Sequence, residues 1–169
     1  FKALFKGTLT TGAFKALLGG FVGLTIAVTI SKSIPNIIVA TLVVALSTNM
    51  MNLFDLRPGR AIKVYTLLAI IIFIASAKFQ REVMMLILPA VLAYFYFDLR
   101  ALTMMGDAGS NVLGVSLGVF IVSSFGLAVQ VVCLILLVLI HILTEKFSLT
   151  KIIENNKFLN YLDRLGRGL

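Results

Sequence analysis

Six apolar segments, each near the length of a membrane-spanning helix, constrain this chain more than any other feature. They fall at residues 13–31, 34–54, 61–77, 82–98, 110–124 and 126–144. A helix needs roughly 17 to 25 residues to cross a hydrocarbon core of about 30 Å. The segments are continuous rather than alternating, and lipid accommodates only helices or closed barrels, which argues against strands. We therefore expect an all-α, polytopic transmembrane helical bundle with about six spans.

Composition supports the same class of protein. Hydrophobic residues make up 60% of the 169-residue chain and charged residues only 13%, whereas a soluble domain is about one quarter charged. A net charge of +8 could indicate nucleic-acid binding, but here the basic residues flank apolar segments, as in membrane proteins. We therefore exclude nucleic acid as a partner. The chain begins at Phe1 without a signal-like segment, and we expect the natural protein to carry a further N-terminal part.

The charged residues divide unevenly between the two ends of the predicted spans. Loops rich in lysine and arginine face the cytoplasm, so the more basic end is predicted to be the cytoplasmic side of the cell membrane. Twelve of the fifteen basic residues lie there: Lys2, Lys6, Lys15, Arg57, Arg60, Lys63, Arg100, Lys146, Lys151, Lys157, Arg164 and Arg167. The other three are Lys32, Lys78 and Arg81. The acidic residues at the cytoplasmic end are Asp55, Asp98, Asp107, Glu145, Glu154 and Asp163.

The C-terminal residues differ from the rest of the chain. Between residues 148 and 165, apolar residues recur at helical spacing with charged residues between them, which is typical of an amphipathic helix. This segment is too polar to span, so we expect it to lie along the inner membrane surface. The chain is thus predicted to comprise a transmembrane bundle, residues 1–147, and an amphipathic cytoplasmic tail, residues 148–169.

Glycines recur at spacings that suit helix packing. Small residues four apart let membrane helices approach closely. We expect this role, rather than ligand contact, at Gly12, Gly19, Gly20, Gly23, Gly114 and Gly118.

Polar residues gather where the second predicted span ends. Asn49, Asn52 and Asp55 are three apart, so on a helix they share one face within two turns. Carboxamides supply donors and acceptors and the carboxylate supplies acceptors, a set that can bind a base or a sugar. A helix end in the lipid headgroup layer explains the same residue types equally well.

A second polar motif, Gly106-Asp107-Ala108-Gly109-Ser110, opens the fifth predicted span. Glycines let a backbone approach a ligand closely, and the N-terminus of the following helix favours phosphate. A carboxylate beside bound phosphate suits Mg²⁺. The alternative is that Asp107 only caps the helix. Both motifs fall at the end that the charge distribution assigns to the cytoplasm, which favours a joint site.

Together the two motifs resemble those of the polyprenyl-phosphate N-acetylhexosamine-1-phosphate transferases, which include the first lipid-linked step of peptidoglycan synthesis and the initiating enzymes of teichoic-acid and O-antigen synthesis. The resemblance rests on Asn49-x-x-Asn52-Leu53-x-Asp55 with Gly59, followed by Gly106-Asp107-x-Gly109-Ser110. Residues 9–19 also look like the start of a core helix in this family. The likeness therefore runs from about residue 9 to residue 124.

The resemblance implies a Mg²⁺-dependent enzyme of cell-envelope glycan synthesis. Such an enzyme moves a sugar-1-phosphate from a UDP-sugar to polyprenyl (undecaprenyl) phosphate and releases UMP. Asp107 is implied to coordinate the metal. Asp55 is implied as a second catalytic residue and, with Asn52, matches residues that line the nucleotide pocket. The implied partners are the donor, the lipid acceptor and membrane lipids, and formation of a homodimer is left open.

Further residues are implied to contact substrate. These are Asn49, Asn52, Gly109 and Ser110, with Arg57 and Arg60 as candidate phosphate contacts. An ordinary positive-inside loop explains the two arginines nearly as well.

Three departures from the family pattern leave an alternative open. Pro58 stands where the family has a second aspartate, the histidine-rich loop is absent, and the adjacent aspartate pair would precede Phe1. His141, the only histidine, lies within the sixth segment and is better explained as a buried, hydrogen-bonded residue. The alternative function is a catalytically inactive relative that binds or transports a lipid-linked phosphate, and an unrelated transporter ranks last.

Overall fold

The computed structural model describes residues 11–103 and 105–167, without the side chains of residues 11–16 and 79. Every regular element within these ranges is an α-helix, which confirms the all-α prediction. Several sequence-based assignments lie outside the described residues. They concern Lys2, Lys6, the beginning of segment 9–19, the surroundings of Gly12 and the side chain of Lys15.

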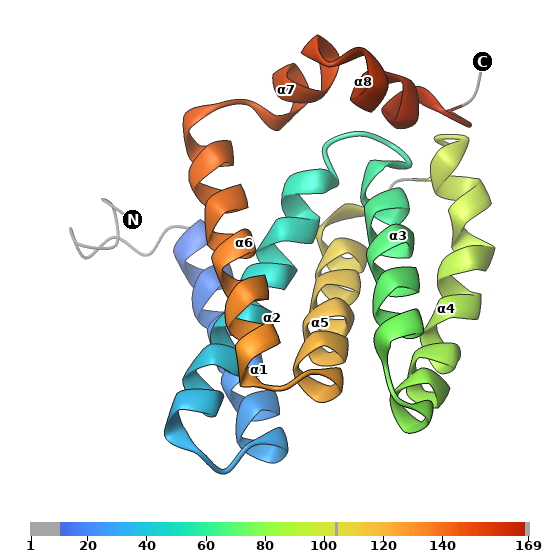
Figure 1. Cartoon of the computed structure of the whole chain (residues 1–169). Helices are drawn as coiled ribbons and strands as arrows, with labels where there is room; N and C mark the ends of the chain where they lie inside the picture. Colours follow the sequence, from blue (N-terminus) through green and yellow to red (C-terminus); the bar gives the residue numbers. More distant parts are fainter. Residues whose placement is uncertain (1–10, 104, 168–169) are drawn as a thin grey trace.

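Six long helices follow one another up and down in chain order and match the six predicted segments (Figure 1). They are α1 (Thr11–Ile30), α2 (Ile34–Phe54), α3 (Arg60–Ala75), α4 (Lys78–Leu99), α5 (Gly106–Ser124) and α6 (Leu127–Lys146). Among the described helices, α2, α5, α6 and the Gln80–Leu99 part of α4 are long and apolar enough to cross a membrane. These helices make the chain a membrane protein. Because α3 has only 16 residues, a total of six crossings stays a prediction.

The turns between the helices contain the residues that their backbone geometry requires. Pro35 lies in the first turn of α2, where its missing N–H costs no helical hydrogen bond. Gly59 precedes α3 with a left-handed backbone, φ 76°, a conformation that glycine adopts without strain. Helices α1, α2, α3 and α6 therefore begin within two residues of the predicted positions, whereas α4 and α5 each begin four residues earlier than predicted.

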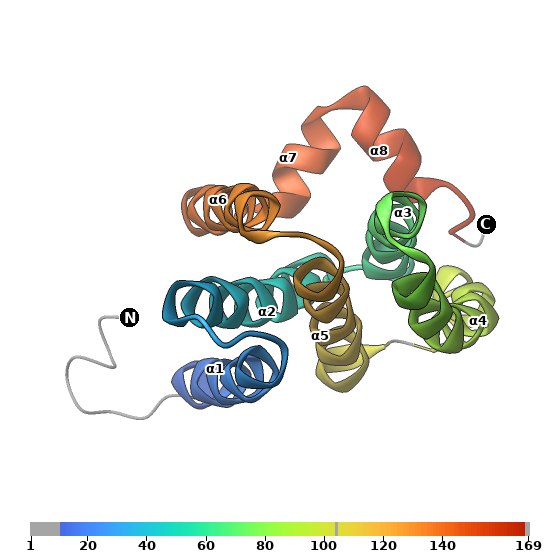
Figure 2. The same ribbon diagram turned by 60° about the horizontal axis from the view of Figure 1, so that its bottom comes forward.

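Helix α5 occupies the middle of the bundle. Viewed nearer to the helix axes, it lies between a group formed by α1, α2 and α6 and a pair formed by α3 and α4 (Figure 2). Its most extensive contact is with α2, and it also packs against α3 and α4. A chain segment that starts at residue 106 is thereby placed beside one that ends at residue 54.

Two predicted packing glycines make the contact between α5 and α2 possible. A Cβ atom added at Gly114 would lie 2.4 Å from Cα of Thr48, and one at Gly118 would lie 2.7 Å from Cα of Val44. Gly23 of α1 similarly approaches the carbonyl oxygen of Thr41. These three glycines confirm the packing prediction, whereas Gly19 and Gly20 face open space.

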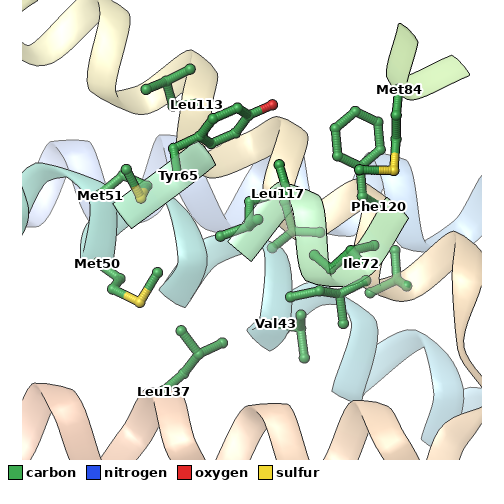
Figure 3. Close-up of a cluster of buried hydrophobic side chains, with 14 of the residues drawn as sticks. Val43, Met50, Met51, Tyr65, Ile72, Met84, Leu113, Leu117, Phe120 and Leu137 are labelled. Atoms are coloured by element: carbon green, nitrogen blue, oxygen red, sulfur yellow. The ribbon is translucent and has the colours of Figure 1, made fainter. Parts of the chain in front are cut away.

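The buried cluster between these helices is almost entirely apolar (Figure 3). Tyr65 of α3 is its largest fully buried side chain, and its hydroxyl accepts a hydrogen bond of 3.1 Å from the hydroxyl of Ser116. A buried tyrosine needs such a partner for its polar end. This bond fixes α3 against the central helix α5.

The tail forms two short helices, α7 (Leu149–Asn155) and α8 (Lys157–Arg164), instead of the single helix that the apolar spacing predicts. The backbone is extended at Asn156, whose side-chain oxygen accepts hydrogen bonds of 3.1 Å from the amides of Phe158 and Leu159. An asparagine that caps a new helix interrupts the preceding one. Both helices lie across the end of the bundle where α3 begins (Figure 1).

We expect Gly114→Ala to lower the free energy of unfolding by about 1–3 kcal/mol, because the added methyl group collides with the backbone of α2. Gly20→Ala is the control, since a Cβ there meets nothing within 4 Å. It should leave stability unchanged or raise it slightly. Thermal unfolding of the detergent-solubilised protein measures both, and equal melting temperatures for the two variants would contradict the close approach of α2 and α5.

Candidate functional site

The two sequence motifs meet at one end of the bundle. The end of α2, the beginning of α3, the end of α4 and the beginning of α5 all lie there (Figure 1). Asn52 of α2 donates from Nδ2 to Oδ1 of Asn111 of α5 over 2.5 Å, and its Oδ1 accepts a hydrogen bond from the hydroxyl of Ser110. Ser110 is fully buried. A polar network therefore joins the first turns of α5 to the last turn of α2.

Asp55 lies at the C-terminus of α2, beside the first residues of α5. Burial, followed by the charges of Asp98 and Asp107, raises the pKa of its carboxyl group to about 6, against a hydrogen bond from the backbone of Gly106 that lowers it. Like charges close together disfavour ionisation. The carboxylates of Asp98 and Asp107, from α4 and α5, are thus near enough to influence Asp55.

Asp107 lies inside the first turn of α5, and the N-cap position belongs to Met105, whose side chain makes no capping hydrogen bond. Both roles of Asp107, metal ligand and helix cap, stay predictions. The side chain is exposed, and a negative charge in the first turn of a helix interacts favourably with the helix dipole. The same position is accessible to a cation or a phosphate-bound metal.

Asp98 belongs to the same cluster although its sequence context marked it only as one of several acidic residues at this end. It is 1% exposed, and its Oδ2 accepts a hydrogen bond of 3.2 Å from the amide of Gly59. Among the described residues its Oδ1 has no hydrogen-bond partner. The sequence signal that could have identified Asp98 is its position as an ionisable residue at the end of an apolar segment. Burying a charged group there costs free energy, so such a residue indicates a site or a structural partner.

The remaining predicted substrate contacts are placed differently from one another. Asn49 is exposed and makes no side-chain hydrogen bond with the described part of the chain. A Cβ added at Gly109 would lie 2.1 Å from Cγ of Met105, so a larger residue there requires the Met105 side chain to move. The substrate roles of Asn49, Asn52, Gly109 and Ser110 stay predictions.

Both predicted phosphate-binding arginines pair with the tail. Arg57 donates to Glu154 over 2.6 Å at the surface. Arg60 is 3% exposed and donates from Nε and Nη2 to the two carboxylate oxygens of Asp163, over 2.7 and 3.0 Å. Their role as phosphate contacts stays a prediction, and the structure adds a second role, which is to attach the tail to the bundle.

His141 is half-buried on α6, and its Nδ1 lies 2.7 Å from the carbonyl oxygen of Leu137. This agrees with its predicted place as a hydrogen-bonded residue of the sixth segment. It lies on a different helix from the motif residues and is not one of the groups that influence Asp55.

The donor set at this end fits Mg²⁺. No group of three or more His, Cys, Asp or Glu among the described residues is arranged as a metal cage. Mg²⁺ does not require one, because it is commonly bound through one or two carboxylates and completes its shell with phosphate oxygens and water. Asp107 is exposed, and Oδ1 of Asp98 has no hydrogen-bond partner among the described residues. Burial and the charges of Asp98 and Asp107 disfavour the ionised form of Asp55. A cation bound here would reduce the repulsion between these carboxylates.

Comparison with known proteins identifies the family. The family model described as glycosyl transferase family 4 matches residues 3–125. The chain belongs to this family. No curated protein and no solved structure matches it. The matched range contains both motifs, so membership of glycosyl transferase family 4 makes the protein a membrane glycosyl-1-phosphate transferase in general terms.

We expect Asp55→Asn to stabilise the metal-free protein more at pH 7.5 than at pH 4.5. The folded pKa of about 6 exceeds the ordinary value of 3.8, so between these values the folded protein binds more protons and Asp55 contributes stability that is lost as pH rises. Asparagine is neutral at both pH values.

Melting temperatures in a chelator test this expectation, with Glu82→Gln, an exposed substitution at the opposite end of the bundle, as control. If the difference in melting temperature between Asp55→Asn and wild type does not change with pH, the neighbouring carboxylates and burial do not disfavour ionisation of Asp55.

Proposed function

We propose that the protein transfers a sugar-1-phosphate from a UDP-sugar to polyprenyl phosphate, with Mg²⁺ and with release of UMP. Membership of glycosyl transferase family 4 supports the reaction class. The observation that carries the finer assignment is the meeting of Asp55 and Asp107 beside the hydrogen-bonded ends of α2 and α5. An acceptor dissolved in the membrane and a charged donor from the aqueous phase would both reach such an end of the bundle.

The reaction exchanges one phosphorus–oxygen bond for another. An oxygen of the lipid phosphate forms a bond to the β-phosphorus of the donor, and the bond from that phosphorus to the oxygen of UMP breaks. Mg²⁺, when bound, supplies charge neutralisation for the pyrophosphate and the leaving group. In the proposal, Asp107 holds the metal and Asp55 adds a second carboxylate to the same charge cluster.

The chain's own contribution is mainly positioning. The bonds of Asn52 to Ser110 and Asn111 hold the ends of two helices together, and the N-terminus of α5 directs its amide groups and dipole toward a bound phosphate. Fixed groups of this kind stabilise developing charge without reorganising during the reaction. Arg57 and Arg60 are omitted from the proposed phosphate site because their guanidinium groups already bind carboxylates of the tail.

We also propose that six helices cross the cell membrane, with the site end in the cytoplasm and the tail at the inner surface. The support is the excess of basic residues at that end and the position of α7 and α8 directly after α6. Phe158, Tyr161 and Leu165 of the tail are exposed, as expected for residues close to lipid headgroups.

Cysteine labelling tests this orientation. In a Cys133→Ser background, Leu56→Cys and Leu165→Cys should react with a membrane-impermeant thiol reagent only from the cytoplasmic side. Lys78→Cys should react only from outside, because residue 78 is the exposed first residue of α4, at the opposite end. Labelling of positions 56 and 78 from the same side would contradict the proposed crossings.

Asp107→Asn should lower the rate of UMP release by the natural full-length protein at least about a hundredfold, because the metal's stabilisation of the transition state is worth several kcal/mol. The loss of a first-turn charge alone should cost only about 0.3–1 kcal/mol of stability. UMP is measured at several Mg²⁺ concentrations, and folding is checked by thermal melts.

Glu82→Gln removes an acidic residue from the opposite end and should leave the rate unchanged. An Asp107→Asn protein with normal, Mg²⁺-dependent turnover would refute the metal assignment. Absence of UMP release from the wild type would favour the inactive relative that binds or transports a lipid-linked phosphate.

A further inference from the structure

The tail contacts the turn that carries Asp55 and the first residues of α3. This turn, residues 55–59, joins α2 to α3 and will be called the site turn. Tail residues 156–167, which bond to Pro58 of the turn and to Arg60 and Lys63 of α3, will be called the clamp segment. Nothing in the reaction itself requires a C-terminal segment at this place, and the family match ends at residue 125, so the contact needs its own explanation.

A buried ion pair anchors the clamp segment. Asp163 is 8% exposed and Arg60 is 3% exposed, and the guanidinium group contacts both carboxylate oxygens. Nη1 of Arg60 also donates to the hydroxyl of Thr150 over 3.1 Å. Burial would raise the pKa of Asp163, but the hydrogen bonds and charges of Arg60 and Arg167 outweigh it and hold the pKa below its usual value. Asp163 is therefore ionised at neutral pH.

Further bonds extend the contact to the site turn and the helix that follows it. Arg167 donates from Nε to the carbonyl oxygen of Pro58 over 3.1 Å, and its Nη2 lies 3.1 Å from Asp163. Lys63 donates to the carbonyl oxygens of Leu162 and Asp163, both over 2.9 Å. The clamp segment therefore binds the turn through backbone as well as side-chain atoms.

The opposite side of the site turn is held by α4. Asp98 accepts the amide of Gly59, and the neighbouring Leu99 packs against Gly166 so closely that a Cβ there would lie 2.1 Å from Cδ2 of Leu99. The turn is thus bonded to α4 through Asp98 and to the clamp segment through Arg167. Asp55 belongs to a turn whose last two residues are bonded on both sides.

The polarity of α8 agrees with this arrangement. Asn156, Asn160, Asp163 and Arg167 recur at helical spacing, and this polar stripe includes the buried Asp163, while the apolar residues Phe158 and Tyr161 are 68% and 64% exposed. A helix that turns its polar side toward the protein is selected by specific bonds rather than by burial of apolar surface.

We propose that the clamp segment fixes the site turn in the geometry needed for transfer, with Asp163 as a positioning residue that acts through Arg60. The catalytic consequence rests on the function proposed above, whereas the effect on the turn does not. Removing one member of a buried ion pair leaves the other charge unpaired, which destabilises the local structure strongly.

Hydrogen exchange of the full-length protein tests the clamp directly. Asp163→Asn should speed amide exchange in peptides covering residues 55–63 at least about tenfold, because local opening releases the bonds of Gly59 and Lys63. Exchange in the α2–α5 core, residues 113–121, should not change. Glu154→Gln is the matched control, since it removes a tail carboxylate whose ion pair is exposed and contributes little.

Arg167→Gln provides a second, milder variant in case Asp163→Asn does not fold. It should speed exchange in the same residues, and Asp163→Glu should restore part of the protection. Unchanged exchange at residues 55–63 in a folded Asp163→Asn or Arg167→Gln protein would overturn the proposal, as would an equal increase throughout the core.

Kinetics then separate the two proposals. Asp163→Asn should lower kcat for UMP release at least about tenfold, because a misplaced turn loses catalytic geometry, with the KM for polyprenyl phosphate unchanged and Glu154→Gln like wild type. A faster-exchanging turn with normal kcat would overturn the positioning role. If the wild type releases no UMP, the function proposed above fails, and the exchange result alone decides whether the clamp exists.

Discussion

The close contact between α2 and α5 is the constraint on which the rest of the structure depends. Gly114 and Gly118 leave no space for a side chain between the two helices, so the helix axes approach as closely as backbones allow. In a membrane, where burial of apolar surface gives no preference for one helix partner over another, such small-residue contacts and polar bonds decide which helices pair. This pairing brings the end of one motif helix to the beginning of the other.

The end of the bundle that carries the site contains both a hydrogen-bond network and closely spaced negative charges. Asn52 of α2 is hydrogen-bonded to both Ser110 and Asn111 of α5, which holds the two helix ends together. Asp55, by contrast, has a pKa raised to about 6 by burial and by two neighbouring carboxylates. Uncompensated negative charge of this kind is stabilised when a cation or a basic ligand binds, and it is the feature of the site that most favours a metal-dependent reaction.

Charged residues also attach the tail to the site turn and to the beginning of α3. The basic residues that the sequence places at this end are only partly available to a ligand, because Arg60 and Lys63 contact the clamp segment and Arg167, within that segment, contacts the site turn. A buried, bidentate arginine–carboxylate pair is costly to desolvate but imposes a single geometry. The tail therefore joins α3 and the end of α4 to the bundle, although it follows all of the long helices in the chain.

Many features could be predicted from local sequence. The six apolar segments, the glycine contacts of α5 and the joint position of the two motifs follow from hydropathy, residue size and the alternation of helix direction. The break in the tail was missed, because the apolar spacing of residues 148–165 is compatible with one helix, and only the capping bonds of Asn156 divide it. Asp98 was missed as a member of the site because, although it ends an apolar segment, it belongs to neither of the two polar motifs.

The sequence by itself determined that this is an all-helical membrane protein, and its motifs indicated the family that the comparison confirms. The length of an apolar segment and the spacing of its residues are local properties, and each can be recognised within one segment of the sequence. The tertiary structure alone decided the partners of the charged groups. Asp98 meets Gly59 across 39 positions and Arg60 meets Asp163 across 103, and whether an arginine binds phosphate or a carboxylate depends on which group the packed helices bring within about 3 Å of it.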